Sequence, residues 1–102
     1  MCVFQGLDAN TVHIRPETDQ WLRKMKDDPI NPLDYEELKY GWLVWVYSVA
    51  EDDGALAMLP PDLAALIQFA ADHNCRVVNL DGDGEIIEDF PRYDEEWEKA
   101  GA

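Results

Sequence analysis

The first periodic segment of the chain is Asn10–Ile14, where polar and apolar residues alternate. This alternation predicts a short strand. Beyond Pro16, which suits the first turn of a helix, apolar residues recur at helical spacing as Trp21, Leu22 and Met25. Acids precede bases along this stretch, as the helix dipole favours. We therefore expect a first helix, ended by residues 27–32 with their two prolines.

The most strand-like segment is Trp42–Val49. Its apolar residues fall on both faces of the expected strand, which favours a central place in a sheet. The preceding residues 33–41 show no clear period and are compatible with a helical turn or a loop. Residues 51–54, three acids and a glycine, indicate a surface turn.

A second helix is expected to begin at Pro60–Asp62, because proline and an acid suit a first helical turn. Apolar residues follow at the spacing of one helix face: Leu63, Leu66, Ile67 and Ala70. Asn74 is a suitable residue at which to end this helix.

The clearest hairpin pattern lies after the second helix. Two segments with β-branched residues, 76–80 and 85–88, flank a turn that contains two glycines. Farther along, a short helix from Tyr93 to Lys99 would place Tyr93 and Trp97 on one face.

The order strand, helix, strand, helix, strand, strand predicts an α+β fold. We expect a small mixed or antiparallel sheet with two helices packed on one face, as a two-layer sandwich. The length of 102 residues suits a single domain over residues 1–102, with an acidic C-terminal tail over about residues 91–102.

Two helices cover only one face of such a sheet. The other face is a candidate interaction surface if it exposes an aromatic patch formed by Leu43, Trp45 and Tyr47. The alternative is that residues 1–9, the 28–41 loop or the tail covers these side chains.

Composition places the chain among folded proteins outside the membrane. The hydrophobic fraction of 47% is too high for a disordered chain, and no apolar stretch reaches the length of a membrane span. Residues 1–5 lack the basic start of a signal peptide, so we expect a cytoplasmic protein. A reducing compartment disfavours a disulfide between Cys2 and Cys75, although their spacing alone leaves it open.

Charge is the strongest feature of the composition, with 22 acids, 8 bases and a net charge of −14. Residues 51–102 hold fourteen of these acids and three of the bases. Such a chain is repelled by nucleic acid and by anionic membranes, and it is attracted to basic surfaces, including those that hold DNA or RNA. The alternative is that acidity only keeps the protein dissolved and monomeric.

Motifs for metal binding or catalysis are weak. Residues 79–84 imitate the opening of a calcium loop, but the twelfth position, which requires a bidentate glutamate, is Phe90. Cys75 with His13 or His73 is a conceivable nucleophile pair, yet no recognised catalytic motif accompanies it. We assign no catalytic, metal or cofactor residues, and we do not expect an enzyme.

The acidic run over residues 81–98 is the best candidate for a binding site. It holds nine acids and one base, Arg92. Carboxylates on an ordered surface can occupy a groove that otherwise holds phosphates, and aromatic residues among them can anchor the contact. The expected partner-binding residues are Asp81, Asp83, Glu85, Glu88, Asp89, Tyr93, Asp94, Glu95, Glu96 and Trp97. The alternative is a solvated hairpin with a frayed acidic tail.

Six short motifs, taken together, carry a family resemblance. They are His13-Ile14, Tyr40-Gly41-Trp42, Pro61-Asp62-Leu63, His73-Asn74-Cys75, Asp81-Gly82-Asp83-Gly84 and Pro91-Arg92-Tyr93. Over about residues 10–94 the arrangement resembles small, acidic, uncharacterised proteins encoded on bacterial plasmids and phages. The resemblance implies genomic company with anti-restriction and other anti-defence genes, and a bacterial cytoplasm. In size and charge the chain is also similar to many phage anti-CRISPR proteins, several of which block nucleic-acid channels.

The favoured hypothesis is an anti-defence inhibitor encoded by a mobile element. It would bind a basic, nucleic-acid-binding surface on a CRISPR effector or restriction enzyme subunit, partly as an acidic mimic of DNA, without binding nucleic acid or a membrane itself. The alternative is a non-enzymatic interaction module, or a homodimer, that binds through the aromatic sheet face. A third hypothesis is a small enzyme that uses Cys75 and a histidine.

Overall fold

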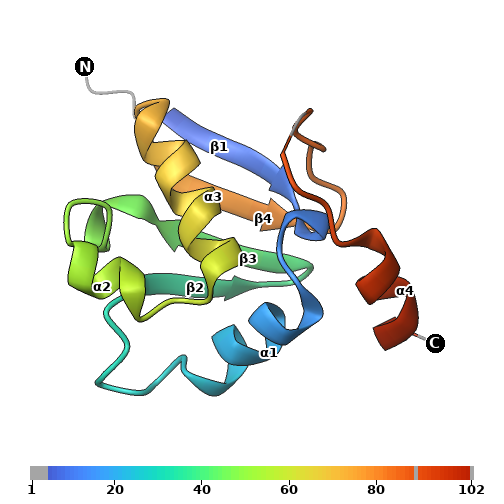
Figure 1. The fold of residues 1–102 in the computed structure, drawn as a ribbon, viewed down its shortest axis with the longest axis horizontal. Helices are drawn as coiled ribbons and strands as arrows, with labels where there is room; N and C mark the ends of the chain where they lie inside the picture. The colour runs from blue at the N-terminus through green and yellow to red at the C-terminus, as the bar shows by residue number, and fades with distance from the viewer. Residues whose placement is uncertain (1–4, 89, 102) are drawn as a thin grey trace.

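A four-stranded mixed sheet forms one layer of the fold (Figure 1). The computed structural model describes residues 5–88 and 90–101. The strands are β1 (Gln5–Asn10), β2 (Asp34–Leu38), β3 (Gly41–Trp45) and β4 (Cys75–Asp81). They lie in the order β1-β4-β3-β2. β1 runs parallel to β4, whereas the β4–β3 and β3–β2 pairs are antiparallel.

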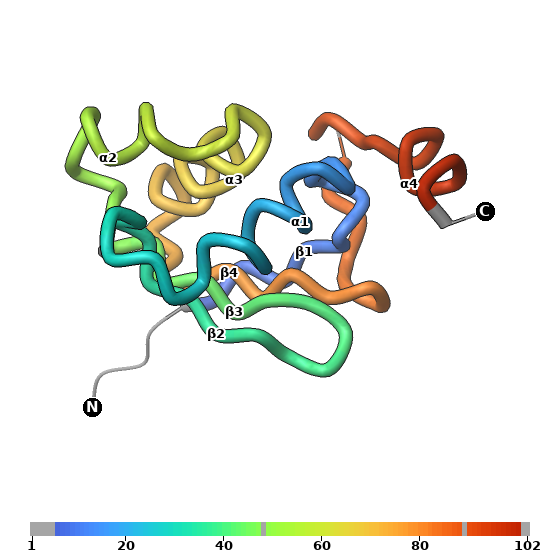
Figure 2. The backbone as a smooth tube through the Cα atoms, turned by 90° about the horizontal axis from the view of Figure 1, so that it is seen from below, coloured from blue at the N-terminus to red at the C-terminus, as the bar shows by residue number. Residues whose placement is uncertain are grey.

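Helices form the second layer. They are α1 (Pro16–Lys24), α2 (Asp53–Ala57), α3 (Pro61–Asp72) and α4 (Asp94–Gly101), with short 3-10 helices η1 (Thr11–His13) after β1 and η2 (Val46–Ser48) after β3. Figure 2 shows α1, α2 and α3 on one side of the sheet. This arrangement confirms the predicted α+β fold, in which helices pack on one face of a small mixed sheet.

The core lies between the sheet and the helices. Trp42 and Val44 of β3 pair with Leu80 and Val78 of β4, and all four side chains are buried. Leu22 of α1 is buried in the same cluster. The apolar stripe predicted for α3 is confirmed, because each of its members is buried in this cluster: Leu63, Leu66, Ile67 and Ala70.

Local signals mark the starts of α1 and α3 and the end of α3 correctly, whereas α1 ends at Lys24, before the expected residues 27–32. α1 begins at Pro16 and α3 at Pro61. The first residue of a helix has no carbonyl partner for its N–H within the helix, so proline, which lacks this N–H, loses no hydrogen bond there. Asn74, just beyond α3, has a φ of 60°, a left-handed conformation that asparagine tolerates and that ends a helix. The short helix expected near the C-terminus is α4, and the acids in its first turn suit the helix dipole.

Two of the predicted strands have different bounds in the structure. The strand expected at Asn10–Ile14 is wrong, because β1 ends at Asn10. The Asn10 side chain accepts a hydrogen bond from Val12 N (3.0 Å) and so caps η1. The strand expected at Trp42–Val49 ends at Trp45, and the next three residues form η2.

The chain contains a hairpin, but not the predicted one. β2 and β3 form it, joined by Lys39 and Tyr40, so residues 33–41 contribute a strand rather than a helical turn or a loop. The returning strand expected over residues 85–88 is wrong. β1 and β3 already occupy both edges of β4 and leave no edge for it.

β2 is difficult to recognise from sequence because it buries a single side chain, that of Tyr35. The Tyr35 hydroxyl donates to the carbonyl oxygen of Leu22 in α1 (2.7 Å) and accepts from Asn31 Nδ2 (3.1 Å). Burial raises the pKa of Tyr35 to about 12. This one aromatic residue therefore fastens an otherwise acidic edge strand to the helical layer.

The sheet face opposite the helices carries Leu43 and Trp45 of β3, with Val77 of β4 paired to Trp45. None of the described helices covers this face (Figure 2). Leu43 and Trp45 are half-buried. Tyr47 is 67% exposed and lies in η2, not on the sheet. The aromatic patch predicted from three residues is thus divided between a sheet face and a helical turn.

Candidate functional site

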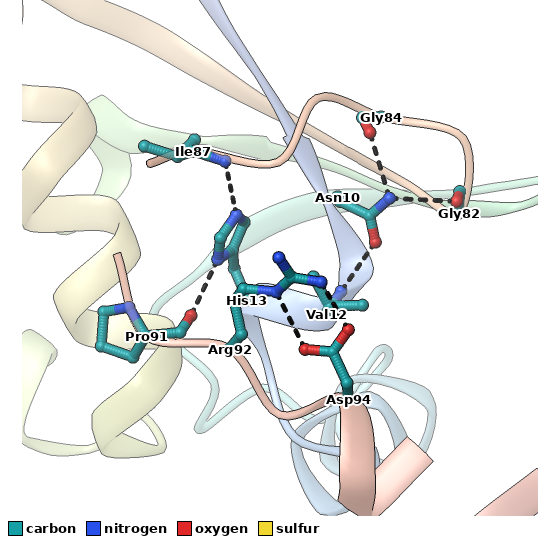
Figure 3. A network of polar contacts seen from close by, with 9 residues as sticks. All are labelled: Asn10, Val12, His13, Gly82, Gly84, Ile87, Pro91, Arg92 and Asp94. Atoms are coloured by element: carbon teal, nitrogen blue, oxygen red, sulfur yellow. Dashed lines mark hydrogen bonds and ion pairs between the residues drawn. The ribbon is translucent and has the colours of Figure 1, made fainter. Parts of the chain in front are cut away.

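Residues 82–93 connect β4 to α4, and we call them the return segment. Its described residues, 82–88 and 90–93, run past η1 and the end of β1 instead of forming a strand (Figure 3). Most of the acids expected to bind a partner lie in this segment or in α4. The positions of these acids therefore depend on the contacts that hold the return segment against the rest of the fold.

Asn10, the last residue of β1, holds the first part of the return segment. Its Nδ2 donates to the carbonyl oxygens of Gly82 (3.2 Å) and Gly84 (3.0 Å), as Figure 3 shows. Its main-chain N donates to Glu85 O (2.8 Å). A Cβ atom on Gly84 would lie 2.4 Å from Ala9 O, so this close approach requires glycine.

His13 holds the second part of the return segment. Its Nδ1 lies 2.8 Å from Pro91 O, and its Nε2 lies 2.8 Å from Ile87 N. A carbonyl oxygen only accepts and a main-chain amide only donates, so the ring is neutral, with its proton on Nδ1. The ring is fully buried, and the edge-on ring of Phe90 packs against it with centroids 5.3 Å apart.

The end of the return segment is held by main-chain and ionic contacts. Tyr93 N donates to Val12 O (2.8 Å). The Arg92 guanidinium donates to both carboxylate oxygens of Asp94, at 2.9 and 2.7 Å. This bidentate pair lowers the pKa of Asp94 and raises the pKa of Arg92. The first residue of α4 is therefore a carboxylate whose charge is balanced by an arginine.

The two aromatic residues expected to anchor a partner contact their own fold. Trp97 is half-buried, and its Nε1 donates to Ile14 O (2.8 Å). The Tyr93 ring lies beneath the Arg15 guanidinium, 4.9 Å from Cζ to the ring centroid. Arg15 Nε also lies 3.7 Å from Glu96 Oε2. These contacts attach α4 to the segment between β1 and α1.

The structure separates the predicted acids into two groups. Asp94 and Glu96 are paired with arginines, and Asp81 accepts from Asp83 N (2.8 Å) through its half-buried side chain. The exposed acids, which enter no ion pair among the described residues, are Asp83, Glu85, Glu88 and Glu95. Asp89 lies outside the described residues. The partner-binding role of all of these acids stays a prediction.

The candidate nucleophile pair is not assembled through its side chains. Cys75 Sγ lies 3.7 Å from the main-chain oxygen of His73, whereas His73 Nδ1 lies 2.8 Å from Phe69 O. The other histidine, His13, has both ring nitrogens engaged by the return segment. Cys2, the second thiol considered above, lies outside the described residues. Within the described ranges, no three His, Cys, Asp or Glu side chains are grouped to hold a metal ion.

Sequence reasoning placed His13 in an expected strand, considered it as a partner for Cys75, and assigned no site role to Asn10. No local signal reveals their roles, because their partners lie more than seventy residues away. In the part of the chain described by the structure, no helix is long and apolar enough to cross a membrane.

Fold and site together define a small α+β domain that displays carboxylates on a segment fastened to its first strand and 3-10 turn. The chain matches the family described as "Family of unknown function (DUF5983) C-terminal domain" over residues 6–95, and it belongs to that family. The match includes Asn10, His13 and the whole return segment. No curated protein and no solved structure matches the chain.

Proposed function

We propose that this domain binds, without catalysing a reaction, a basic surface of another macromolecule through the exposed carboxylates of the return segment and α4. The observation that carries the proposal is that Asp83, Glu85 and Glu88 lie exposed on a segment fastened by Asn10, His13 and Val12. Acids on a fastened segment lose less conformational entropy on binding than acids on a free tail. This favours a binding surface over a merely solvated hairpin.

The partner in this proposal is a bacterial defence complex, such as a CRISPR effector or a restriction enzyme subunit, whose basic channel holds nucleic acid. The domain would compete for that channel as an acidic mimic. Support comes from the net charge of −14 and from the resemblance to proteins of plasmids and phages. Carboxylates attract a basic channel and so accelerate association. Salt weakens this attraction, as it weakens the attraction of phosphates.

Acids that already form ion pairs with arginines would contribute less to binding of the partner than acids that form none. Asp94 and Glu96 already interact with Arg92 and Arg15, so a partner must compete with these arginines for them. Glu95, on the exposed side of α4, has no such competitor among the described residues. The contact is therefore centred on the return segment and extended by Glu95.

The test compares two triple variants with the same change in charge. One carries Asp83→Lys, Glu85→Lys and Glu88→Lys. The matched control carries Asp27→Lys, Glu51→Lys and Asp53→Lys, three exposed acids in other parts of the fold. Each protein is titrated into a panel of purified CRISPR effectors and restriction enzymes, and DNA binding by each complex is measured at low and high salt.

Wild type and control should displace DNA from at least one complex, most strongly at low salt, and the return-segment variant should not. When expressed in cells that carry the same defence system, wild type and control should raise the plating efficiency of phage, and the return-segment variant should not. Equal displacement by both variants would contradict the proposed surface. Failure of wild type against the whole panel would contradict a defence complex as the partner.

A second candidate function uses the sheet face opposite the helices. Leu43 lies there half-buried, beside the buried Val77, and none of the described helices covers this face (Figure 2). Binding through this face would persist at high salt, because it is driven by apolar burial. Leu43→Asp would abolish it, whereas the return-segment variant would leave it intact.

A further inference from the structure

His13 is buried and titratable, and the proposed binding function does not use its ring. We propose that His13 is a proton-dependent clasp: its neutral ring holds the return segment in place, and its protonation releases residues 86–88 and 90–92. The inference rests on the contacts of His13 and holds whether or not the proposed function is correct.

The two ring nitrogens make this contact sensitive to one proton. Nδ1–H donates to Pro91 O, and the lone pair of Nε2 accepts from Ile87 N. A second proton can add only at Nε2, where it would face the N–H of Ile87. The hydrogen bond would become a donor–donor contact, and the ring would carry a buried charge without an acceptor at Nε2. A histidine exposed to water changes charge between about pH 5 and pH 8, so the released ring would gain this proton in mild acid.

The other groups around the ring do not replace the lost acceptor. Phe90 packs edge-on against His13, and Phe69 of α3 packs against Phe90 with centroids 5.1 Å apart. His73, one ring farther away, stacks on Phe69. These groups form an apolar and aromatic boundary on the side of α3.

Charged groups near the clasp come from the return segment and α4. Glu85 and Glu88 are exposed to solvent, which screens them. The carboxylate of Asp94 accepts two hydrogen bonds from Arg92, which chiefly lower its pKa. None of these contacts puts an acceptor at Nε2, where Ile87 N lies. Asp89, in the same segment, lies outside the described residues.

Release would be local because the contacts on either side do not titrate with His13. Asn10 still holds Gly82, Gly84 and the main chain of Glu85, and Val12 O still accepts from Tyr93 N. Acid would therefore open the middle of the return segment while both of its ends stay attached. Glu88, an exposed acid of the candidate site, lies in that middle part.

The direction of the pH effect follows from proton counting. The closed state holds a neutral ring, whereas the released state exposes the ring to water and lets it bind a proton. The released state binds more protons, so acid favours it, by up to about tenfold for each pH unit over which only the released ring is charged.

The experiment is amide hydrogen exchange by NMR on the whole chain, between about pH 7.5 and about pH 5.5, where histidine titrates. After correction for intrinsic exchange, protection of Ile87 N–H should fall by up to about tenfold. Two amides serve as internal controls and should change less than about twofold: Tyr93, bonded to Val12 O, and Val78 in the core. A parallel loss at Val78 would indicate global unfolding and overturn the proposal.

The variant His13→Gln distinguishes the effect of protonation from the effect of the hydrogen bonds themselves. Glutamine offers a donor and an acceptor but does not titrate, so Ile87 protection should become independent of pH. If this variant does not fold, the ring nitrogens of wild-type His13 provide the same test by 15N NMR. Near neutral pH they should show a proton on Nδ1 and none on Nε2, and acid should protonate Nε2 in step with Ile87 exchange. A doubly protonated ring near neutral pH, or unchanged Ile87 protection in acid, would overturn the clasp.

Discussion

The Thr18 hydroxyl lies 2.6 Å from Asp62 Oδ2, and this buried contact joins the first turns of α1 and α3. The same carboxylate accepts from Arg15 N (2.7 Å), the residue that precedes α1. Arg15 makes no capping contact through its own side chain. Asp62 therefore caps a helix to which it does not belong, and it also lies at the positive end of its own helix.

Replacing Asp62 should destabilise the fold more than replacing an acid at the surface. Asp62→Asn keeps the shape but removes the charge and one acceptor, so we expect a loss of about 1–3 kcal/mol in the free energy of unfolding. Glu17→Gln, an exposed change in the same turn of α1, should stay within about 0.5 kcal/mol of wild type. Urea denaturation measures both, and equal midpoints for the two variants would contradict the capping role.

Two glycines give a matched test of the close approach between β1 and the return segment. Gly84→Ala should destabilise by about 1–3 kcal/mol, because the added Cβ would meet the main-chain oxygen of Ala9. Gly54→Ala, inside α2, meets only the Asp52 side chain at 3.3 Å and should change the stability by less than about 1 kcal/mol. Thermal unfolding distinguishes the two. A Gly84→Ala protein as stable as wild type would show that the return segment can shift without loss.

Tyr35 should produce a late step in an alkaline titration. Burial raises its pKa from 10.0 to about 12, so the folded state holds the phenol proton more tightly than the unfolded state. The stability from this proton is complete below pH 10 and is lost as pH rises through about 12. Tyrosinate absorbance should show one group titrating in that range, and Tyr35→Phe should lack it. Persistence of the step in Tyr35→Phe would refute the assignment.

The uncovered sheet face should not form a homodimer at low salt. Leu43 lies on this face in one row with Asp8 of β1 and Glu36 of β2. Glu36 pairs with Leu43, Leu43 pairs with Asn79 of β4, and Asn79 pairs with Asp8. Two copies placed face to face would bring these like charges together. We expect light scattering to give a monomer in dilute salt, with any association appearing only as salt rises. A dimer independent of salt would favour the sheet face as the binding surface.

The parts of the fold predicted correctly are those that depend on neighbours in sequence. The apolar stripe of α3, the prolines that begin two helices and the left-handed Asn74 are all local features. The parts predicted wrongly depend on competition between distant segments. Residues 85–88 have the pattern of a strand, but β1, whose own pattern was not recognised, takes the edge of β4 that they would need.

The same distinction applies to the site. Counting acids pointed to a region in which Asp83, Glu85 and Glu88 are exposed, and their role in binding stays a prediction. It did not reveal which acids arginines neutralise, because Arg15 reaches Glu96 from the other end of the sequence. It also assigned Trp97 to a partner, although Ile14 O accepts its N–H. Composition predicts charge well, but it does not predict which charged or aromatic groups the fold itself uses.

The parallel pairing of β1 with β4 also determines the order in which the chain can fold during synthesis. Gly6 pairs with Val77, so β1 leaves the ribosome long before its partner is made. The β2–β3 hairpin can form early, but it has no central strand to join until β4 emerges. Closure of the sheet therefore waits until β4 (Cys75–Asp81) has been made, and the nascent protein exposes its core strands until then. A truncation before Cys75 would remove β4, the only strand that pairs with β1 in the described sheet, and chaperones or proteases would treat such a chain as unfolded.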